Sequence, residues 1–325
     1  MGTRPFRFGL QSFSASSAKE WTDRARKAED LGYSSFMLAD HYIGPGPALE
    51  ATGHPVQSVA AVPAITLAAE ATTTIKVGCR VMCVDYRNPV VLAKEMATID
   101  LFSDGRLELG LGAGWLQGEY EAMGVPFDPP GERIQRLADV IALVKATMAD
   151  GLTAFEGASG VKAVGFEGVP KPVQRPHPPI MVGGGAPRVL RLAGREADIV
   201  SFNFNNRAGV IGPDGLGSST AEATAQKVGW VREGAGERFD DVELEIGAYF
   251  TVVTEHVEAT AGQFSAMFGM PPEAVLEHPH VLIGTVEGIC DELERRREAY
   301  GISYVTVGDG NIEAFAPVVA RLSGR

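Results

Sequence analysis

The stretch Arg-Leu-Glu-Leu-Gly-Leu-Gly-Ala-Gly-Trp at residues 106–115 decides the fold, because it reads as a buried strand that runs directly into a glycine loop. The stretch Pro-Ile-Met-Val-Gly-Gly-Gly-Ala-Pro-Arg at residues 179–188 repeats this arrangement. Glycine lets the backbone turn with positive φ and lets a ligand approach backbone N–H groups closely. Pro187 suits the first position of a helix, whose free amides form an anion site. The two loops are therefore either ordinary strand-to-helix turns or two segments that bind the same phosphate-bearing cofactor.

Strand-like and helix-like segments alternate outward from these two loops along the whole chain. Eight such units in 325 residues predict an α/β fold, a (β/α)8 TIM barrel with insertions, as one domain over 1–325. A doubly wound sheet is the alternative, but its fingerprint needs Gly-x-Gly-x-x-Gly after the first strand. Here Gly110, Gly112 and Gly114 have another spacing and follow the fourth strand. Strands are expected at 6–11, 34–39, 75–84, 106–112, 179–183, 197–202, 242–253 and 302–307.

Three segments interrupt the alternation. Residues 152–172, with their glycines and prolines, predict a hairpin-like insertion. Residues 203–218 and 254–283 follow the sixth and seventh strands, so we expect these insertions near the active-site mouth, where barrel enzymes carry their functional loops. The Gly-, Asn- and Pro-rich segment 203–218 is long for a plain connection and is a candidate lid.

The composition narrows the function classes. A formal net charge of −12 argues against a nucleic-acid partner, so local donors must hold any anionic cofactor. The absence of a run of about eighteen apolar residues argues against a membrane span. Strand-like sequence already at Phe6 predicts no signal peptide, and three cysteines without zinc spacing fit reduced thiols, so we expect a cytoplasmic protein. We expect no metal site, because no histidine or carboxylate cluster stands at the strand ends.

The residues that close the strands of a barrel are the candidate site residues. Asp40-His41, at the end of the second strand, is the chemically richest pair. A histidine with a pKa near neutrality can donate a hydrogen bond or a proton to a substrate, although an isolated Asp-His pair also fits a structural role. The expected pocket residues at the first, second, fourth and sixth strand ends are Gln11, Tyr42, Trp115, Phe202 and Asn203.

Several short sequence motifs follow one another in a characteristic order up to about residue 202. They are Phe-Arg-Phe-Gly at 6–9, Ala-Glu-Asp-Leu-Gly-Tyr at 28–33, Asp40-His41, Asn88-Pro89, Ala-Thr-Ile-Asp-Leu-Phe-Ser-Asp-Gly-Arg at 97–106, and the stretches 109–115, 179–185 and 195–198. In this order they resemble the bacterial luciferase-like family, and within it the branch of deazaflavin (coenzyme F420)-dependent oxidoreductases. Residues 203–283 match no family pattern securely, and the substrate is expected to depend on them.

The resemblance implies roles for matching residues. Asp40 would hydrogen-bond the ring of the cofactor, and His41 would stand near its reactive carbon as a possible acid. A non-proline cis peptide would fall near Arg80-Val81 and press on the back face of the ring. The phosphate and tail would be held by Ala113, Gly114, Gly183 and Gly184 and by Arg188, whose alternative role is a solvated helix side chain.

One departure from the family bears on the substrate. Sugar-phosphate dehydrogenase members carry a proton-transfer glutamate where this chain has Trp115. This difference argues against glucose-6-phosphate and favours a more apolar substrate beside Trp115, Tyr42 and Phe202, unless Trp115 packs against a helix instead. The sequence thus predicts an F420-dependent oxidoreductase that acts as a homodimer on a small organic molecule. The alternatives are an FMN-dependent monooxygenase and a non-enzymatic flavin-binding protein, and intact Asp40-His41 and glycine loops argue against the last.

Overall fold

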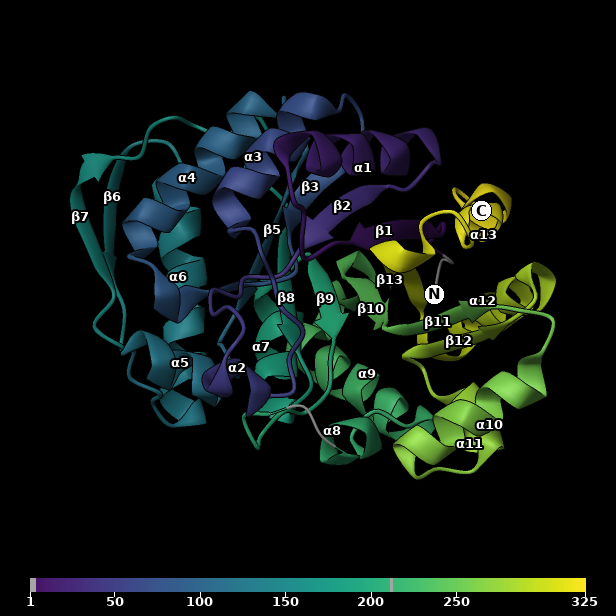
Figure 1. Ribbon diagram of the computed structural model, residues 1–325. Coiled ribbons are helices and arrows are strands. Elements are labelled where there is room, and N and C mark those ends of the chain that lie inside the picture. Colours follow the sequence, from purple (N-terminus) through teal and green to yellow (C-terminus); the bar gives the residue numbers. More distant parts are fainter. Residues whose placement is uncertain (1–3, 211–212) are drawn as a thin grey trace.

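A closed barrel of parallel strands forms the centre of the molecule (Figure 1). The computed structural model describes residues 4–210 and 213–325. The strand order is β3-β2-β1-β13-β10-β9-β8-β5-β4, and an additional pairing of β3 with β5 closes the ring. Because β3 (Lys76–Cys79) and β4 (Met82–Cys83) are two halves of the third strand, the nine strands occupy the eight positions of a TIM barrel. The predicted fold is confirmed, and the doubly wound alternative is excluded.

The elements alternate as strand and helix around the ring. The other barrel strands are β1 (Arg7–Gln11), β2 (Ser35–Leu38), β5 (Leu107–Gly112), β8 (Ile180–Gly184), β9 (Ile199–Phe202), β10 (Glu243–Ala248) and β13 (Ile302–Gly308). The longer helices around them are α1 (Ala18–Asp30), α3 (Ala61–Ala71), α4 (Pro89–Phe102), α6 (Pro130–Met148), α7 (Pro187–Glu196), α9 (Ala221–Ala235), α12 (Val286–Tyr300) and α13 (Ala316–Leu322). Shorter helices in the connections are α2 (Pro47–Glu50), α5 (Gln117–Met123) and α8 (Pro213–Gly217), and η1 (Val84–Tyr86), η2 (Gly236–Asp241) and η3 (Asp309–Asn311) are 3₁₀ turns. Among the described residues, no helix is long and apolar enough to cross a membrane.

Capping residues set the helix starts. The side chain of Asn88 accepts hydrogen bonds from the N–H groups of Val90 at 2.9 Å and Val91 at 3.3 Å, and Pro89 occupies the first helical turn. A cap of this kind contributes about 1 kcal/mol and fixes where the helix begins relative to the preceding strand. Ser17, Thr220 and Thr285 cap α1, α9 and α12 in the same way.

The inside of the barrel carries buried charged and polar side chains, whereas the layer between barrel and helices is apolar. Near the amino ends of the strands, Arg7 pairs with Glu243 at 2.6 Å and with Glu108. Toward the carboxyl ends, Arg80 Nε lies 2.9 Å from Glu245 Oε1, and both side chains are buried. Ion pairs at this depth are costly to break, because each charge depends on the other for stabilisation.

Two small sheets lie outside the barrel. The segment 152–172 contains the antiparallel strands β6 (Leu152–Glu156) and β7 (Lys162–Glu167), which stand at the left edge of Figure 1. On the opposite side, β11 (Phe250–Val253) pairs in parallel with β12 (Val281–Gly284), next to α10 (Val257–Phe268) and α11 (Pro272–Glu277). The expectation of one strand over 242–253 was therefore wrong. The chain leaves the barrel after β10, because β12 offers β11 a separate hydrogen-bonding edge.

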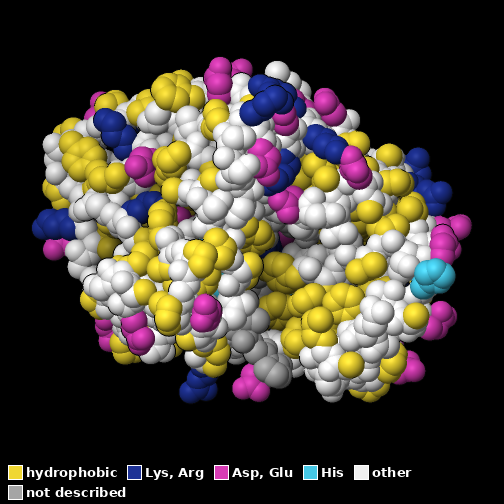
Figure 2. Space-filling model, viewed as in Figure 1, with side chains coloured by type: hydrophobic (Ala, Val, Ile, Leu, Met, Phe, Trp, Pro, Cys, Tyr) yellow, Lys and Arg dark blue, Asp and Glu magenta, His cyan; other side chains and the backbone are white. Residues whose placement is uncertain are grey.

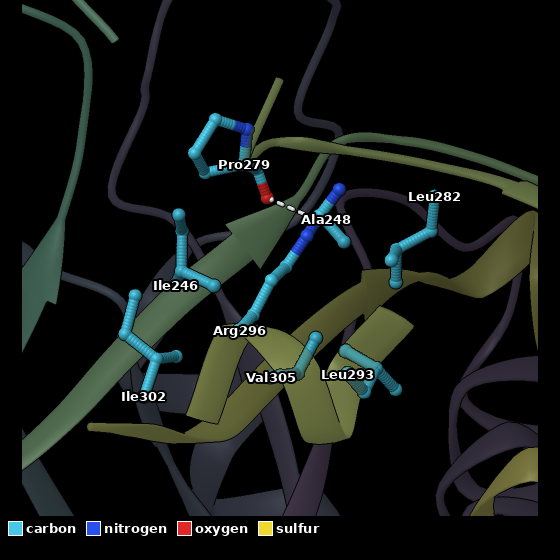
Figure 3. A pocket seen from close by; sticks show the side chains of 8 residues that line it. All are labelled: Ile246, Ala248, Pro279, Leu282, Leu293, Arg296, Ile302 and Val305. Carbon is cyan, nitrogen blue, oxygen red and sulfur yellow. Dashed lines mark hydrogen bonds between the residues drawn. The ribbon is translucent and has the colours of Figure 1, made fainter. Parts of the chain in front are cut away.

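The insertion over 254–283 is anchored to the barrel by Arg296 of α12. Its buried guanidinium donates to the carbonyl oxygen of Pro279 at 2.9 Å (Figure 3). It also forms an ion pair with Glu292 at 2.6 Å. Apolar side chains from β10, β13 and α12 surround it and leave a cavity of only about 10 Å³. Pockets for organic ligands usually measure roughly 300–1,000 Å³, so this cavity is a packing feature.

The other expected insertion, over 203–218, includes α8, and its residues 211 and 212 lie outside the described part of the chain. The side chain of Lys227 on α9 holds the start and the end of this insertion together. Its ammonium group donates to the carbonyl oxygen of Asn203 at 2.7 Å and to the hydroxyl of Ser219 at 2.6 Å. The face seen in Figure 2 is hollowed near its centre, and hydrophobic side chains line the lower right of the hollow.

Candidate active site

The carboxyl end of β2 leads into a hydrogen-bonded pair, His41 and Glu119. The Nδ1 atom of His41 lies 2.8 Å from Glu119 Oε2, and the side chain of Glu119, on α5, is fully buried. The other carboxylate oxygen of Glu119 accepts the backbone N–H of Tyr42 at 2.5 Å, and the hydroxyl of Tyr86 donates to Oε2 at 3.0 Å. The arrangement holds the histidine in one tautomer, with Nδ1 as the donor and Nε2 directed away from the carboxylate.

The electrostatics of Glu119 support this assignment. Burial alone would raise the pKa of its carboxyl, but hydrogen bonds from His41, Tyr42 and Tyr86 outweigh burial and hold the pKa below its ordinary value. An ionised, buried carboxylate therefore stands behind His41. This pairing of a histidine with a carboxylate orients the imidazole for proton exchange at Nε2.

Aromatic rings surround His41. The ring of Trp115, which follows β5, lies 6.2 Å from the ring of His41, centroid to centroid. The ring of His54, from the loop after α2, is closer, at 3.9 Å, and also lies 5.9 Å from Trp115. Trp115 is half-buried, so part of its surface faces solvent beside His41. These three rings form an aromatic wall at the mouth of the barrel.

The carboxylate oxygens of Asp40 already accept hydrogen bonds from other groups of the protein. The two oxygens form a bidentate ion pair with Arg87, at 2.5 and 2.6 Å. They also accept the backbone N–H of Cys83 at 2.9 Å and the hydroxyl of Tyr42 at 2.8 Å. These four donors use the acceptor positions of a carboxylate. In this arrangement Asp40 has no free acceptor for a cofactor ring. Arg87 and Tyr42 are both more exposed than Asp40.

Tyr42 is the most exposed member of this group, with 41% of its surface accessible. Burial of its hydroxyl and the neighbouring charge of Asp40 raise the pKa of Tyr42 far above its ordinary value. The phenol therefore remains a hydrogen-bond donor at all physiological pH values. The Arg87 guanidinium lies 5.6 Å from the centre of the Tyr42 ring, which stabilises the pair further.

The peptide bond between Arg80 and Val81 is cis, at the position that the resemblance implied. Val81 is half-buried, and its methyl groups lie against the glycines of two neighbouring strands. A Cβ atom added to Gly112 would lie 2.6 Å from a methyl carbon of Val81, and one added to Gly183 would lie 3.4 Å away. Glycine at these positions leaves room for Val81 as an apolar floor between β5 and β8.

The side chain of Arg80 points into the barrel and not toward the loops. Its Nη1 atom donates to Tyr249 at 3.0 Å and to Gln11 at 3.4 Å, in addition to the ion pair with Glu245. The Tyr249 hydroxyl in turn donates to the side-chain oxygen of Asn203. Gln11, Arg80 and Asn203 thus form one buried-to-surface network. Arg80 lies beneath the site, and its Nε and Nη1 atoms donate to partners inside the protein.

The first glycine loop is shaped by Gly114, whose φ of +68° favours glycine. A Cβ atom at this position would lie 1.7 Å from the hydroxyl oxygen of Tyr120, so no other residue fits without rearrangement. Arg133, on α6, donates to the carbonyl oxygen of Ala113 at 3.1 Å and to that of Gly114. These carbonyls are turned toward Arg133, which fixes the loop between β5 and α5.

The second glycine loop leads from β8 into α7. The carbonyl oxygen of Gly184 accepts the backbone N–H of Asn203 at 2.9 Å, and Pro187 begins the helix. The exposed side chain of Arg188 reaches toward the start of α6, since a Cβ atom on Gly131 would lie 2.8 Å from its Nη1. Arg188 thus stands between the amino ends of α6 and α7, where backbone amides and helix dipoles favour an anion.

One expected pocket residue lies elsewhere. Phe202 has no exposed surface and belongs to the main apolar core, so it does not line the mouth. Its position two residues after Val200, on the same face of β9, explains this, because alternate side chains of a strand point to opposite faces. Among the residues that the structure describes, no three histidine, cysteine or carboxylate side chains are grouped so as to hold a metal ion.

Sequence reasoning missed Glu119, Arg87 and His54. Each reaches the site from a different connection. For Glu119 a signal existed, because it lies one turn of helix after the glycine loop and Trp115. For His54, a loop histidine beside a proline carried no such signal.

Comparisons with known proteins identify the family. The model of the luciferase-like monooxygenases matches residues 4–299, which is most of the chain. The chain belongs to this family. A relative from Pseudomonas putida, the FMNH(2)-dependent dimethylsulfone monooxygenase, is 33% identical over 123 residues, 38% of this chain and 34% of that protein. The F420-dependent glucose-6-phosphate dehydrogenase of Amycolatopsis mediterranei is 30% identical over 183 residues, 55% of this chain and 52% of that protein. The matches thus span about half or less of these relatives' lengths.

Solved structures agree on the fold. The coenzyme F420-dependent tetrahydromethanopterin reductase from Methanopyrus kandleri superimposes with a TM-score of 0.74 at 21% identity, over 98% of this chain and 100% of that chain. An F420-dependent secondary alcohol dehydrogenase, solved with an F420-acetone adduct, gives 0.77 at 17% identity, over 98% and 99%. At this identity the likeness establishes the barrel alone.

Proposed function

We propose that this chain is an oxidoreductase that transfers hydride between coenzyme F420 and an apolar organic substrate at the carboxyl end of the barrel. The observation that carries the proposal is His41, held on the buried carboxylate of Glu119 with Nε2 directed away from it. The family and the F420-dependent relatives support the cofactor. A histidine so oriented supplies proton exchange, while the hydride chemistry requires a redox cofactor.

The residues at the mouth fit a flat cofactor with a phosphate-bearing tail. Val81 offers a half-buried apolar floor between the glycines of β5 and β8. Arg188 and the amino ends of α6 and α7 offer an anion site to one side. A chain with a formal charge of −12 attracts no anion at long range, so these local donors would have to provide the affinity.

Each residue then has a role in the proposed reaction. When bound, the deazaflavin supplies a ring carbon that accepts or releases a hydride. His41 exchanges the proton at Nε2, and Glu119 fixes its tautomer. Ala113, Gly114, Gly183, Gly184 and Arg188 hold the phosphate and tail. Because the oxygens of Asp40 are filled by its neighbours, we assign it the role of orienting Arg87 and Tyr42, which can donate to the ring edge.

The substrate is proposed to be apolar, on the evidence of the wall beside His41. Trp115 takes the place of a proton-transfer glutamate of the sugar-phosphate dehydrogenases and lies against His41 and His54. A half-buried indole offers an apolar face of large area, but no charge for a sugar phosphate. Tyr42 and Asn203 add polar groups at the rim.

A second candidate, FMN-dependent monooxygenation, is favoured by one specific observation. The dimethylsulfone monooxygenase match reaches 33% identity, above that of the F420-dependent dehydrogenase. The same floor and loops would accept riboflavin mononucleotide. A flavin-binding protein without activity is disfavoured, because the carboxylate–histidine pair would then have no purpose.

The experiment that tests the proposal follows deazaflavin absorbance in the absence of oxygen. The protein is mixed with oxidised or reduced F420 and a panel of alcohols, aldehydes, ketones and activated alkenes, chosen to be apolar. We expect substrate-dependent reduction or oxidation of F420. Turnover that appears only with reduced FMN and dioxygen would establish the monooxygenase instead.

The oligomer is proposed to be a homodimer. Exposed apolar side chains lie on α4 and on the hairpin segment 152–172, and exposed apolar surface of this kind is typical of protein–protein contacts. Burying this face against a second copy would remove it from water. Light scattering should give about twice the mass of the chain, and a polar substitution at Phe102 should shift the protein toward monomer. The residues are Val91, Leu101, Phe102, Leu152, Val164 and Val169.

A further inference from the structure

The loop between α2 and α3 holds His54 rigidly over the candidate site. Gln57, buried in this loop, donates to the carbonyl oxygen of Ala39 at 2.9 Å, directly before Asp40. The hydroxyl of Thr52, also buried, accepts the backbone N–H of His54 at 3.1 Å. The loop is thereby tied to the end of β2, the strand that carries His41. Hydrogen bonds thus fix the position of His54 at the mouth of the barrel, and the proposed reaction gives this residue no role.

The ring of His54 is fixed in one tautomer. Its Nδ1 atom lies 2.8 Å from the carbonyl oxygen of Pro55, so Nδ1 carries the proton and donates it there. The centroid of its ring lies 3.9 Å from that of the His41 ring, and the two ring planes are tilted by 44° to each other. Phe13 and Trp115 complete its surroundings, at 6.2 and 5.9 Å. His54 therefore lies directly beside the ring of His41, while the hydrogen bond to Pro55 holds its own ring in place.

We propose that His54 is a positioning residue for His41, which keeps the imidazole of His41 in the single orientation that faces Glu119 with Nδ1. Without a neighbour at van der Waals distance, an imidazole can rotate by about 180° about its terminal side-chain bond. Such a rotation would exchange the positions of the two nitrogen-bearing edges. The centroids of the His54 and Trp115 rings lie 3.9 and 6.2 Å from that of the His41 ring, so the two neighbours restrict this rotation. This inference rests on the proposed function, since it gives His54 its purpose there.

The charges around His54 are consistent with this role. Burial, and after it the neighbouring charge of His41, lower the pKa of His54 to about 4. The hydrogen bond to Pro55 and the charge of Glu119 act in the opposite direction without overcoming them. These are the titratable groups that face His54. His54 is therefore a neutral ring at physiological pH, and it confines His41 without competing for the carboxylate of Glu119.

Nuclear magnetic resonance of histidine ring nitrogens tests the inference without cofactor or substrate. In the unmodified protein we expect one set of signals for His41, with the proton on Nδ1. His54→Ala removes the ring, so the His41 signals should split or broaden as the ring samples a second orientation. His54→Phe keeps an aromatic ring beside His41 and should restore the single set. His177→Ala is the matched control, because His177 makes the same bond to the following proline at 2.9 Å, away from His41.

Two outcomes would overturn the inference. Unchanged His41 signals in His54→Ala would show that His54 does not position the ring. Equal disturbance in His54→Phe and His54→Ala would show that an aromatic ring at this position does not suffice to hold His41. Where F420 turnover is found, His54→Ala should lower kcat on the order of ten-fold and leave F420 affinity within two-fold, since misplaced catalytic groups cost rate. Because the resonance experiment needs no turnover, failure of the proposed function would leave it readable.

Discussion

At the scale of single residues, the site depends on how His41 is held. Position alone predicted this histidine, because it ends a barrel strand, whereas its partner Glu119 comes from a helix 78 residues further along the chain. Local sequence patterns report strand ends, but not which later side chain folds back onto them. Asp40 shows the same limit, since its neighbour Arg87 occupies the oxygens that the family resemblance assigned to a cofactor.

His41→Ala is predicted to slow hydride transfer without a comparable loss of cofactor affinity. General acid–base groups contribute on the order of 10²–10⁴-fold, and the cofactor tail is expected to bind elsewhere. Single-turnover absorbance of the deazaflavin measures the rate, and calorimetry measures the affinity. A rate within two-fold of the unmodified protein would make His41 structural, and parallel loss of binding would make it a binding residue.

Gly114→Asp is predicted to weaken cofactor binding severely. The substitution adds a side chain where a Cβ would already lie 1.7 Å from Tyr120, and adds negative charge beside the proposed phosphate site. Binding is measured by fluorescence of F420, with circular dichroism to establish that the variant folds. Gly124→Asp is the matched control, because Gly124 also has a positive φ but has no atom near its Cβ position. Unchanged affinity in a folded Gly114→Asp protein would move the phosphate elsewhere.

At the scale of elements, periodicity predicted the barrel strands and most helices, and it failed where the partner of a segment is not local. The expected strand 242–253 divides into β10 and β11, because β12 supplies an edge that no pattern near residue 250 reveals. The alanine-rich segment 56–71 indicates a helix, but α3 begins only at Ala61. The residues before it form the loop that carries His54, whose shape depends on tertiary hydrogen bonds.

Glu29→Gln is predicted to destabilise the junction between α1 and β3 in a pH-dependent manner. The carboxylate of Glu29 accepts backbone N–H groups of Thr73, Thr74 and Ile75, at 2.9, 2.5 and 3.0 Å. Burial would raise the pKa of Glu29, but these bonds lower it from 4.5 to about 2. Partial exposure keeps the expected loss near 1 kcal/mol at pH 7.

The sign of the pH effect follows from the lowered pKa of Glu29. Its stabilisation is fully present above about pH 4.5 and is lost as the pH falls through about 2. Thermal unfolding at several pH values should therefore show the largest difference between the variant and the unmodified protein at neutral pH. Asp30→Asn, at the exposed neighbouring position, is the control. A difference that grows toward low pH would contradict the account.

At the scale of the whole molecule, the number and order of strand–helix units predicted the barrel. They did not predict the charged side chains that pair inside it. The buried pair of Arg80 and Glu245 joins β10 to the turn between β3 and β4, across the centre of the barrel. No local sequence pattern pairs the two residues, because they lie 165 positions apart in the chain. Only closure of the ring brings the two charges together.

Glu245→Leu is predicted to destabilise the protein by about 3–5 kcal/mol, because it leaves the buried charge of Arg80 without its carboxylate. Chemical denaturation measures the free energy of unfolding. Glu233→Leu is the control, since it breaks the exposed pair with Arg191, whose contribution should be about 0–1 kcal/mol. Equal effects of the two substitutions would show that the interior pair is not a stabilising contact of the barrel.

The central claim is that the mouth of this barrel is built for the deazaflavin. Titration calorimetry of the purified protein with oxidised F420 and with FMN, under identical buffer and salt, tests it most directly. We predict F420 to bind at least about ten-fold more tightly, a difference of about 1.4 kcal/mol. Equal affinities, or tighter binding of FMN, would contradict the assignment.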